Sequence, residues 1–276
     1  MYKVNSNKHR YLVLMVFTLF LSTSLQAKEK SAEELAKAAQ NPIAAMISLP
    51  LQLNTNFGVG PNEDTQYILN IQPVVPFELS KDWNLITRTI LPVMSQPGMA
   101  PGQGRKNGVG DIQFSAFFSP KAPTASGWIW GAGVIAQLDS ASNDALGAGK
   151  WGLGPTAVAL KSDGQWVYGG LINNVWDVAG DDNRADINMM LFQPFVNYNV
   201  PGKPGRYYTF APVITANWEA TSGNTWTIPL GGGIGQIMKW GTQAVNLQAS
   251  AYYNVEKPTN GADWQLRLQM QFLFPK

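Results

Sequence analysis

In Trp264-Gln-Leu-Arg-Leu-Gln-Met-Gln-Phe-Leu-Phe274, near the end of the chain, apolar and polar side chains alternate. Successive side chains of a β-strand point to opposite faces, so this period of two separates the residues into two sets. One face carries Trp264, Leu266, Leu268, Met270, Phe272 and Phe274, and the other carries Gln265, Arg267, Gln269 and Gln271. The first face suits hydrocarbon and the second suits water, which predicts a strand in the wall of a membrane-spanning barrel.

The same alternation recurs in segments of about ten residues, the length expected of barrel strands. Residues 48–57, 66–77 and 245–253 each set apolar side chains on one face against serine, asparagine and glutamine on the other. The predicted strands are 46–57, 65–77, 83–93, 110–118, 128–138, 150–160, 166–177, 186–198, 206–218, 225–237, 243–255 and 264–274. We therefore predict an all-β fold, a transmembrane antiparallel β-barrel of about twelve strands, with ten or fourteen strands as alternatives.

The composition favours lipid as the surroundings of this barrel. Only 14% of the residues are charged, against about 25% in ordinary soluble domains. Tryptophans cluster near the predicted strand ends, as in the aromatic girdles at membrane interfaces. The girdle candidates are Trp83, Trp128, Trp151, Trp166, Trp176, Trp218, Trp226 and Trp264, while Trp130 lies just inside a strand and Trp240 in a turn. The alternative is a soluble β-sandwich with a tryptophan-filled core, which should instead place aromatic residues at strand middles.

The N-terminus has the features of a cleaved signal peptide over residues 1–27. Lys3, Lys8 and Arg10 precede the apolar run Tyr11–Leu21, and small residues lead to Ala27. A membrane-spanning helix needs about 20 apolar residues, more than this run contains. Removing the three basic residues leaves 20 − 3 = 17 Lys+Arg against 18 Asp+Glu, a net charge of −1. We expect secretion to the cell outer membrane and no nucleic-acid partner.

Residues 28–42 are predicted to form a short N-terminal periplasmic helix, and residues 43–276 the barrel. Ser31 and Glu34 have the spacing of a capping box, and Asn41-Pro42 should end the helix. The apolar stripe of this helix is mostly alanine. Two interpretations stay open: the segment plugs the barrel mouth, or it extends into the periplasm.

Eight prolines fall inside the predicted strands, where a missing N–H group removes a hydrogen bond from the ladder. They are Pro50, Pro73, Pro76, Pro92, Pro155, Pro194, Pro212 and Pro229. Because a closed barrel has no edge strand, we expect β-bulges or interruptions of the strands near these positions.

Few residues suggest catalysis. The single histidine, His9, lies in the predicted signal peptide, so the mature chain has no imidazole for serine hydrolysis or metal ligation. There is no cysteine. Gly147–Lys150 and Gly231–Gly235 lack the spacing or position of phosphate-binding loops, and we interpret them as small residues of the barrel wall. We predict no enzyme activity, no cofactor and no metal site.

One acidic cluster leaves an alternative open. Asp177, Asp181, Asp182 and Asp186 crowd a predicted outer loop. Oxygen-rich loops can bind calcium, but a solvated loop, or one bridged to lipopolysaccharide by divalent ions, is the preferred interpretation. The expected partners are outer-membrane lipid and lipopolysaccharide, the barrel-assembly machinery and an unidentified small solute.

The polar faces of the predicted strands would line the interior of the barrel. Candidate lining residues are Arg88, Arg267, Asn70, Gln72, Gln113, Asn173, Gln248 and Gln269. The two arginines could attract an anionic solute. In the structural alternative, which we prefer from the sequence, they pair with acidic residues such as Asp111 or Glu78 and stiffen the interior.

Four segments carry a resemblance to a known family: 69–77, 83–90, 149–157 and the closing Leu273-Phe-Pro-Lys276. They resemble proteobacterial outer-membrane transporters that are often mislabelled neuromedin U, and are similar to the barrels grouped with the meta-pathway of phenol degradation. The resemblance spans nearly the whole mature chain. It implies a β-barrel and the passage of small solutes, including aromatic or hydrophobic ones. The alternative is a structural or surface-interaction barrel with a closed lumen.

Overall fold

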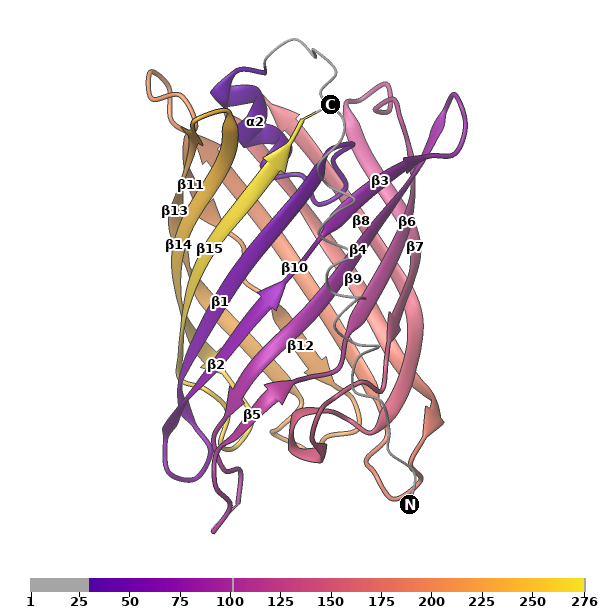
Figure 1. Cartoon of the computed structure of the whole chain (residues 1–276), viewed down its shortest axis with the longest axis vertical. Helices are drawn as coiled ribbons and strands as arrows, with labels where there is room; N and C mark the ends of the chain where they lie inside the picture. Colours follow the sequence, from indigo (N-terminus) through magenta and orange to yellow (C-terminus); the bar gives the residue numbers. More distant parts are fainter. Residues whose placement is uncertain (1–29, 101, 276) are drawn as a thin grey trace, which may run out of the picture. The chain divides into compact units, whose positions relative to one another are not determined.

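A computed structural model describes residues 30–100 and 102–275 of the chain, which form a closed antiparallel β-barrel (Figure 1). The predicted signal peptide lies outside the described residues. Fifteen strand segments are present: β1 Ile47–Val59, β2 Asp64–Ile71, β3 Val74–Glu78, β4 Trp83–Gln96, β5 Lys106–Val109, β6 Gln113–Pro120, β7 Trp128–Gln137, β8 Lys150–Asp163, β9 Trp166–Gly180, β10 Asn188–Asn199, β11 Arg206–Phe210, β12 Ile214–Asn217, β13 Trp226–Trp240, β14 Gln243–Glu256 and β15 Trp264–Phe274.

Three pairs of consecutive segments each continue one strand across a short break, so the wall has twelve strands. The pairs are β2 with β3, β5 with β6, and β11 with β12. Neighbouring strands pair antiparallel along the chain, and β1 pairs with β15 from Ile47↔Phe274 to Phe57↔Trp264. That pairing closes the sheet. The predicted barrel with about twelve strands is confirmed, and the soluble sandwich is wrong.

Prolines explain where the strands break. Pro194 on β10 falls opposite Pro212, and no ladder pairing is formed between Phe192↔Ile214 and Val196↔Phe210. Neither proline has an N–H group to donate, so neither of the two facing strands can supply a backbone hydrogen bond to the other at this position. Pro73 separates β2 from β3, and Pro92 lies opposite the break between β5 and β6. A further register shift falls at Ile228/Pro229.

The strand made of β5 and β6 begins earlier than predicted. Residues 106–109 lie outside the predicted strands, but they form β5 and pair with the end of β4. The pairing then stops at Gly110, whose N–H donates to the carbonyl of Pro92 at 2.9 Å. Pro92 cannot return a hydrogen bond, so the ladder resumes only at Gln113. The sequence pattern therefore did not reveal β5, a short strand that lies within a glycine-rich region.

Side chains alternate between the outside and the inside of the wall as the sequence predicts. On β15, Trp264 and Leu268 are 52% and 43% exposed, whereas Arg267 is 4% exposed. From Lys150 to Lys161, β8 alternates in the same way between buried and more exposed positions. Apolar side chains thus cover the outside, and most polar side chains of the strands point inward.

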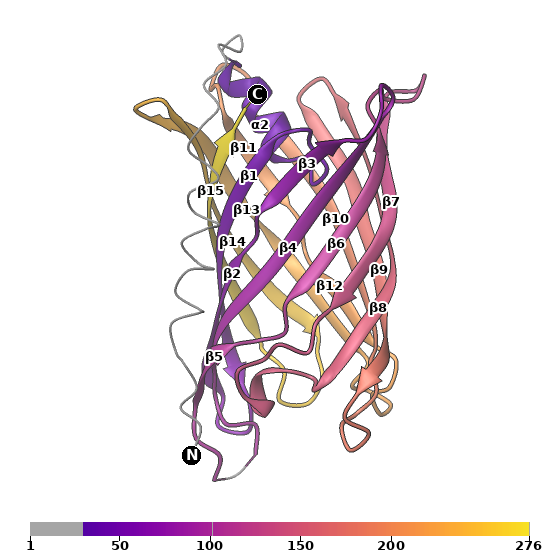
Figure 2. The same cartoon turned by 45° about the vertical axis from the view of Figure 1, so that its right-hand side comes forward.

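The predicted helix forms as α2, Ala32–Ala39. Its capping box is present: the N–H of Glu34 donates to Ser31 Oγ at 3.1 Å, and the Glu34 carboxylate accepts from the Ser31 N–H at 2.8 Å. Turning the view shows α2 at the barrel end where β15 finishes (Figure 2). We call this the helix end and the opposite one the loop end. Among the described residues, no helix has the length and hydropathy to cross a membrane.

Candidate functional site

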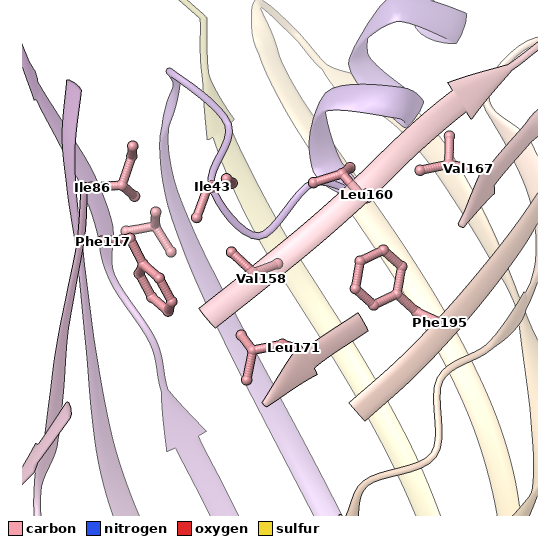
Figure 3. Packing of buried hydrophobic residues seen from close by; sticks show 9 residues of the cluster. Ile43, Ile86, Phe117, Val158, Leu160, Val167, Leu171 and Phe195 are labelled. Carbon is pink, nitrogen blue, oxygen red and sulfur yellow. The ribbon is translucent and has the colours of Figure 1, made fainter. Parts of the chain in front are cut away.

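The helix end of the barrel is filled by an apolar cluster around Ile43. This residue lies between α2 and β1, and its side chain is 4% exposed (Figure 3). The cluster consists of Ile43, Val74, Ile86, Phe117, Val158, Leu160, Val167, Leu171 and Phe195. Such a cluster excludes water because its members pack side chain to side chain. Residues 40–44, between α2 and β1, therefore lie inside the barrel, and we call them the stopper segment.

Helix α2 anchors this stopper segment to the wall. Leu35 and Ala36 pack with Ile237, Ala244 and Leu273 of the last strands. One residue past the helix, the side-chain amide of Gln40 exchanges two hydrogen bonds with that of Asn199 on β10, at 2.9 and 3.2 Å. A reciprocal amide pair satisfies both buried groups at once. Of the two sequence interpretations of this segment, the contacts favour the plug.

The middle of the barrel holds a polar cavity of about 350 Å³. Its wall includes six of the predicted lining residues: Asn70, Gln72, Arg88, Gln113, Asn173 and Arg267. The other two, Gln248 and Gln269, border a smaller space of about 110 Å³ nearer the stopper segment. The strands thus bring all eight candidates to the interior, in two neighbouring spaces rather than one.

Arg267 is held by several groups that carry no charge. Its guanidinium donates to Asn54 Oδ1 at 3.3 Å, to Gln265 Oε1 at 3.0 Å and to the backbone carbonyl of Ala211 at 3.0 Å. The Tyr252 ring lies 4.9 Å from the guanidinium carbon, a distance suited to a cation–π contact. The Ala211 carbonyl is available because the ladder breaks beside Pro212. A strand interruption thus supplies a ligand for the buried charge.

Arg88 is likewise bound by an amide, since its Nη2 donates to Gln72 Oε1 at 2.5 Å. Gln72 lies at the break between β2 and β3, beside Pro73. The expected pairing of the arginines with Glu78 or Asp111 is wrong. No ion pair within the described residues includes either arginine; Glu78 instead pairs with Lys121 at 3.0 Å. Sequence alone could not show this, because the partner depends on register and on height along the barrel.

Asp111 has a different role, which is to hold the loop of residues 138–149. Its carboxylate accepts hydrogen bonds from the N–H groups of Ser140, Ala141 and Ala148 at 3.2, 3.1 and 2.7 Å. Arg184 binds the same loop from the other side through the carbonyl of Ala148 at 3.0 Å. Leu146 is buried in this loop. The loop is therefore fixed at the loop end of the barrel.

Two glutamines separate the interior spaces from one another. Gln52 on β1 and Gln193 on β10 border the central cavity, the space of about 110 Å³ and a third space of about 150 Å³. Arg88 borders the central and third spaces, and Arg267 borders the central and second spaces. Gln52, Arg88, Gln193 and Arg267 therefore lie where the interior spaces meet, and we call these four residues the ring.

Three of the four aspartates in the acidic loop are bound by neighbouring groups of the protein. Lys150 Nζ binds Asp177 at 3.2 Å and also contacts Asp186. The Asn183 backbone and side-chain N–H groups both donate to Asp181 at 2.9 Å, and they hold the pKa of that carboxyl below its ordinary value. Across residues 30–100 and 102–275 no group of acidic or histidine side chains is arranged to hold a metal ion.

The tryptophans lie at the two ends of the wall. Trp83, Trp128, Trp130, Trp166 and Trp240 are at the helix end, and Trp151, Trp176, Trp218, Trp226 and Trp264 are at the loop end. All except half-buried Trp128 are more than one-third exposed. Several stack on one another, with ring centroids 6.0 Å apart for Trp83–Trp130 and 5.4 Å for Trp218–Trp226. Their side chains are thus directed outward in two bands.

Sequence analysis missed three residues that shape the interior. Ile43 was read as the start of the barrel, and neither Gln52 nor Gln193 was singled out as a separator. For the glutamines a signal existed, since Gln52 shares the polar face of its strand with Asn54. Gln193 stands next to Pro194, and that proline hid the alternation around it.

Comparison with known proteins supports the fold. No family model matches the chain, and no curated protein sequence is significantly similar to it. Among solved structures, an outer membrane channel from Pseudomonas putida F1 has a TM-score of 0.63 at 18% identity, over 85% of this chain and 96% of that one. A chain from work on in-meso crystallization of membrane proteins has a TM-score of 0.51 at 12% sequence identity, over 83% of each chain. Outer membrane phospholipase A from Escherichia coli has a TM-score of only 0.44 at 10% sequence identity, over 90% of this chain and 99% of that one.

Proposed function

We propose that this chain is an outer-membrane β-barrel through which small solutes pass passively. The observation that carries the proposal is the central cavity of about 350 Å³, lined by amides and two arginines, inside a wall whose outer face is apolar. An interior meant only for stability could be packed with apolar side chains, as it is around Ile43. A polar, hydrogen-bonding interior instead suits water and dissolved solutes.

The outer surface supports the membrane location. Large apolar side chains such as Leu230, Ile234 and Leu268 are 51%, 45% and 43% exposed along the wall. In water, exposed apolar surface of this extent is unfavourable, whereas lipid tails match it. Tryptophan bands at both ends suit the two membrane interfaces. The signal peptide predicted over residues 1–27 would export the chain across the inner membrane, which is the first step toward the outer membrane.

The solutes should be small, because the route narrows at Gln52 and Gln193 and then meets the stopper segment. Glutamine side chains change rotamer quickly, so the ring can yield to a small molecule. Ile43 cannot yield in this way, since its side chain is packed within a cluster of buried apolar residues. Passage to the periplasm therefore requires the stopper segment to shift.

A barrel with a permanently closed lumen is the second candidate. The apolar cluster that includes Ile43 favours it, since this packing fills part of the helix end. In that case the polar cavity would be a vestibule without an exit, and the barrel would serve a structural or surface-interaction role. An enzyme is not proposed, because the sequence has no histidine beyond His9.

Planar-bilayer recording of the purified mature chain distinguishes the two candidates. A channel predicts discrete conductance steps, and swelling of liposomes in small sugars, amino acids or organic acids. A permanently closed barrel predicts neither. A variant lacking residues 28–40 should conduct more than the intact chain if α2 anchors the stopper segment. Absence of conductance and of liposome swelling for both proteins, with the barrel shown to be folded by circular dichroism, would support the closed-lumen candidate.

A further inference from the structure

The two buried arginines have more donors than the protein uses. A guanidinium has five N–H donors; in the described part of the chain Arg267 engages three of them and Arg88 engages one. Their partners are amide and carbonyl oxygens without charge. A buried cation without a counter-charge is energetically costly, so such a site favours an anion.

The cavity also has a net positive charge. Among its lining residues the ionisable side chains are Arg88, Arg267 and Asp111. The carboxylate of Asp111 is already engaged by loop N–H groups and by Gln137 at 3.4 Å. The lining therefore carries two positive charges and one negative charge, and the negative charge is committed to the loop. An incoming anion meets attraction near the ring, not repulsion.

The rest of the lining determines what kind of anion fits. Partly exposed apolar side chains occupy part of the cavity wall, among them Ile68, Ile90, Met94, Leu191 and Val213. An inorganic ion would leave this apolar surface without a partner. A carboxylate with a short hydrocarbon body would place its charge on the guanidinium groups and its body on the apolar wall, and burying each CH₂ is favourable.

We propose that Arg88 and Arg267 form a binding site for small organic carboxylates with an apolar body, within the central cavity. This inference rests on the proposed function, because it names the class of solute that the channel would accept. Arginine suits the role, since its planar donors match both oxygens of a carboxylate. The amides that hold each arginine keep the donors directed into the cavity before the solute arrives.

Isothermal titration of the purified mature chain in a non-ionic detergent tests the site directly. Hexanoate serves as the probe, and hexanamide is its neutral analogue of nearly the same shape. Hexanoate should bind about tenfold or more tightly than hexanamide, because a hydrogen bond to a charged group is stronger than one to a neutral group. Equal affinity for the two probes would overturn the proposal without any variant being made.

Substitutions then locate the site. Arg88→Gln and Arg267→Gln should each weaken hexanoate binding about tenfold or more and leave hexanamide binding unchanged. Arg105→Gln is the matched control, since Arg105 is partly exposed at the loop end and does not line the cavity. If both cavity variants bind hexanoate as well as Arg105→Gln does, the binding lies elsewhere and the proposal is wrong.

Bilayer recordings on the same preparations separate this inference from the proposed function. Conductance together with equal binding of the two probes would refute the carboxylate site and leave the channel standing. Selective binding of hexanoate without conductance would support the site and refute the channel. Both expectations are met only if the protein conducts and also binds the carboxylate selectively.

Discussion

The two halves of the barrel interior are built from the same strands, but one is a packed apolar cluster and the other is a polar cavity. Near the helix end, inward side chains such as Ile86, Phe117 and Val158 pack in one apolar cluster with Ile43. Further along, inward positions hold Arg88, Asn173 and Arg267 around a cavity of about 350 Å³. Strand β9 belongs to both halves, since Val167 is in the apolar cluster and Asn173 lines the cavity.

This difference shows that alternation fixes which side chains point inward, but not what the interior does. A strand obeys the same period of two in both halves. Whether its inward residues form a core or a passage depends on which of them meet at one height around the barrel. Strand register and the segment inserted from the N-terminal side determine which inward residues lie at the same height.

The largest effect should follow from removing the stopper segment. Deleting residues 30–44 removes α2 and Ile43, and with them the contacts that close the helix end. We expect larger and more stable single-channel currents in planar bilayers than the intact chain gives. Glu33→Gln, an exposed change on α2, is the control and should leave the currents as they are. Unchanged currents after the deletion would mean that the closure lies elsewhere.

A smaller change at the centre of the cluster should reduce stability. Ile43→Ala leaves a cavity among packed apolar side chains and should cost about 2–5 kcal/mol of unfolding free energy. Ile172→Ala removes the same atoms from the outer face, where the side chain is 46% exposed, and should cost about 0.5 kcal/mol or less. Denaturant titrations in detergent compare the two variants. Equal losses would contradict a packed core at the helix end.

Tyr207, which lines the space of about 110 Å³ near the helix end, offers a still smaller test. Its hydroxyl lies 3.0 Å from Asn246 Oδ1 and 3.1 Å from Gln248 Oε1, and its ring packs where a side chain at Gly235 would have to be. Tyr207→Phe should cost about 1 kcal/mol, the usual loss for one hydrogen bond. Tyr208→Phe, on an exposed neighbour, should cost less. If the two substitutions cost the same, the buried bond contributes nothing measurable.

The sequence predicts the wall well because its signal is local. A period of two is visible within one strand, so residues 264–274 reveal their two faces without any knowledge of their neighbours. The capping box of α2 is equally local, because Ser31 and Glu34 are three residues apart. Features of this kind were predicted close to their observed bounds.

The interior was harder to predict because its contacts join distant strands. Whether Arg88 meets Gln72 or Glu78 depends on the pairing of β3 with β4, which no local pattern fixes. The break at Pro212 becomes intelligible only when Pro194 is seen opposite it. The insertion of Ile43 depends on a loop rather than on a strand. These are tertiary properties, so sequence reasoning left them as alternatives or missed them.

Cysteine labelling on β9 tests the central account most directly, because the natural chain has no cysteine. Single variants Val167→Cys, Ile172→Cys and Asn173→Cys would be treated in intact membranes with a charged thiol reagent that does not enter lipid. The account predicts rapid labelling at 173 in the polar cavity, and little at 167 in the packed cluster or at 172 on the lipid face. Rapid labelling at 172, or equal labelling at all three positions, would contradict it.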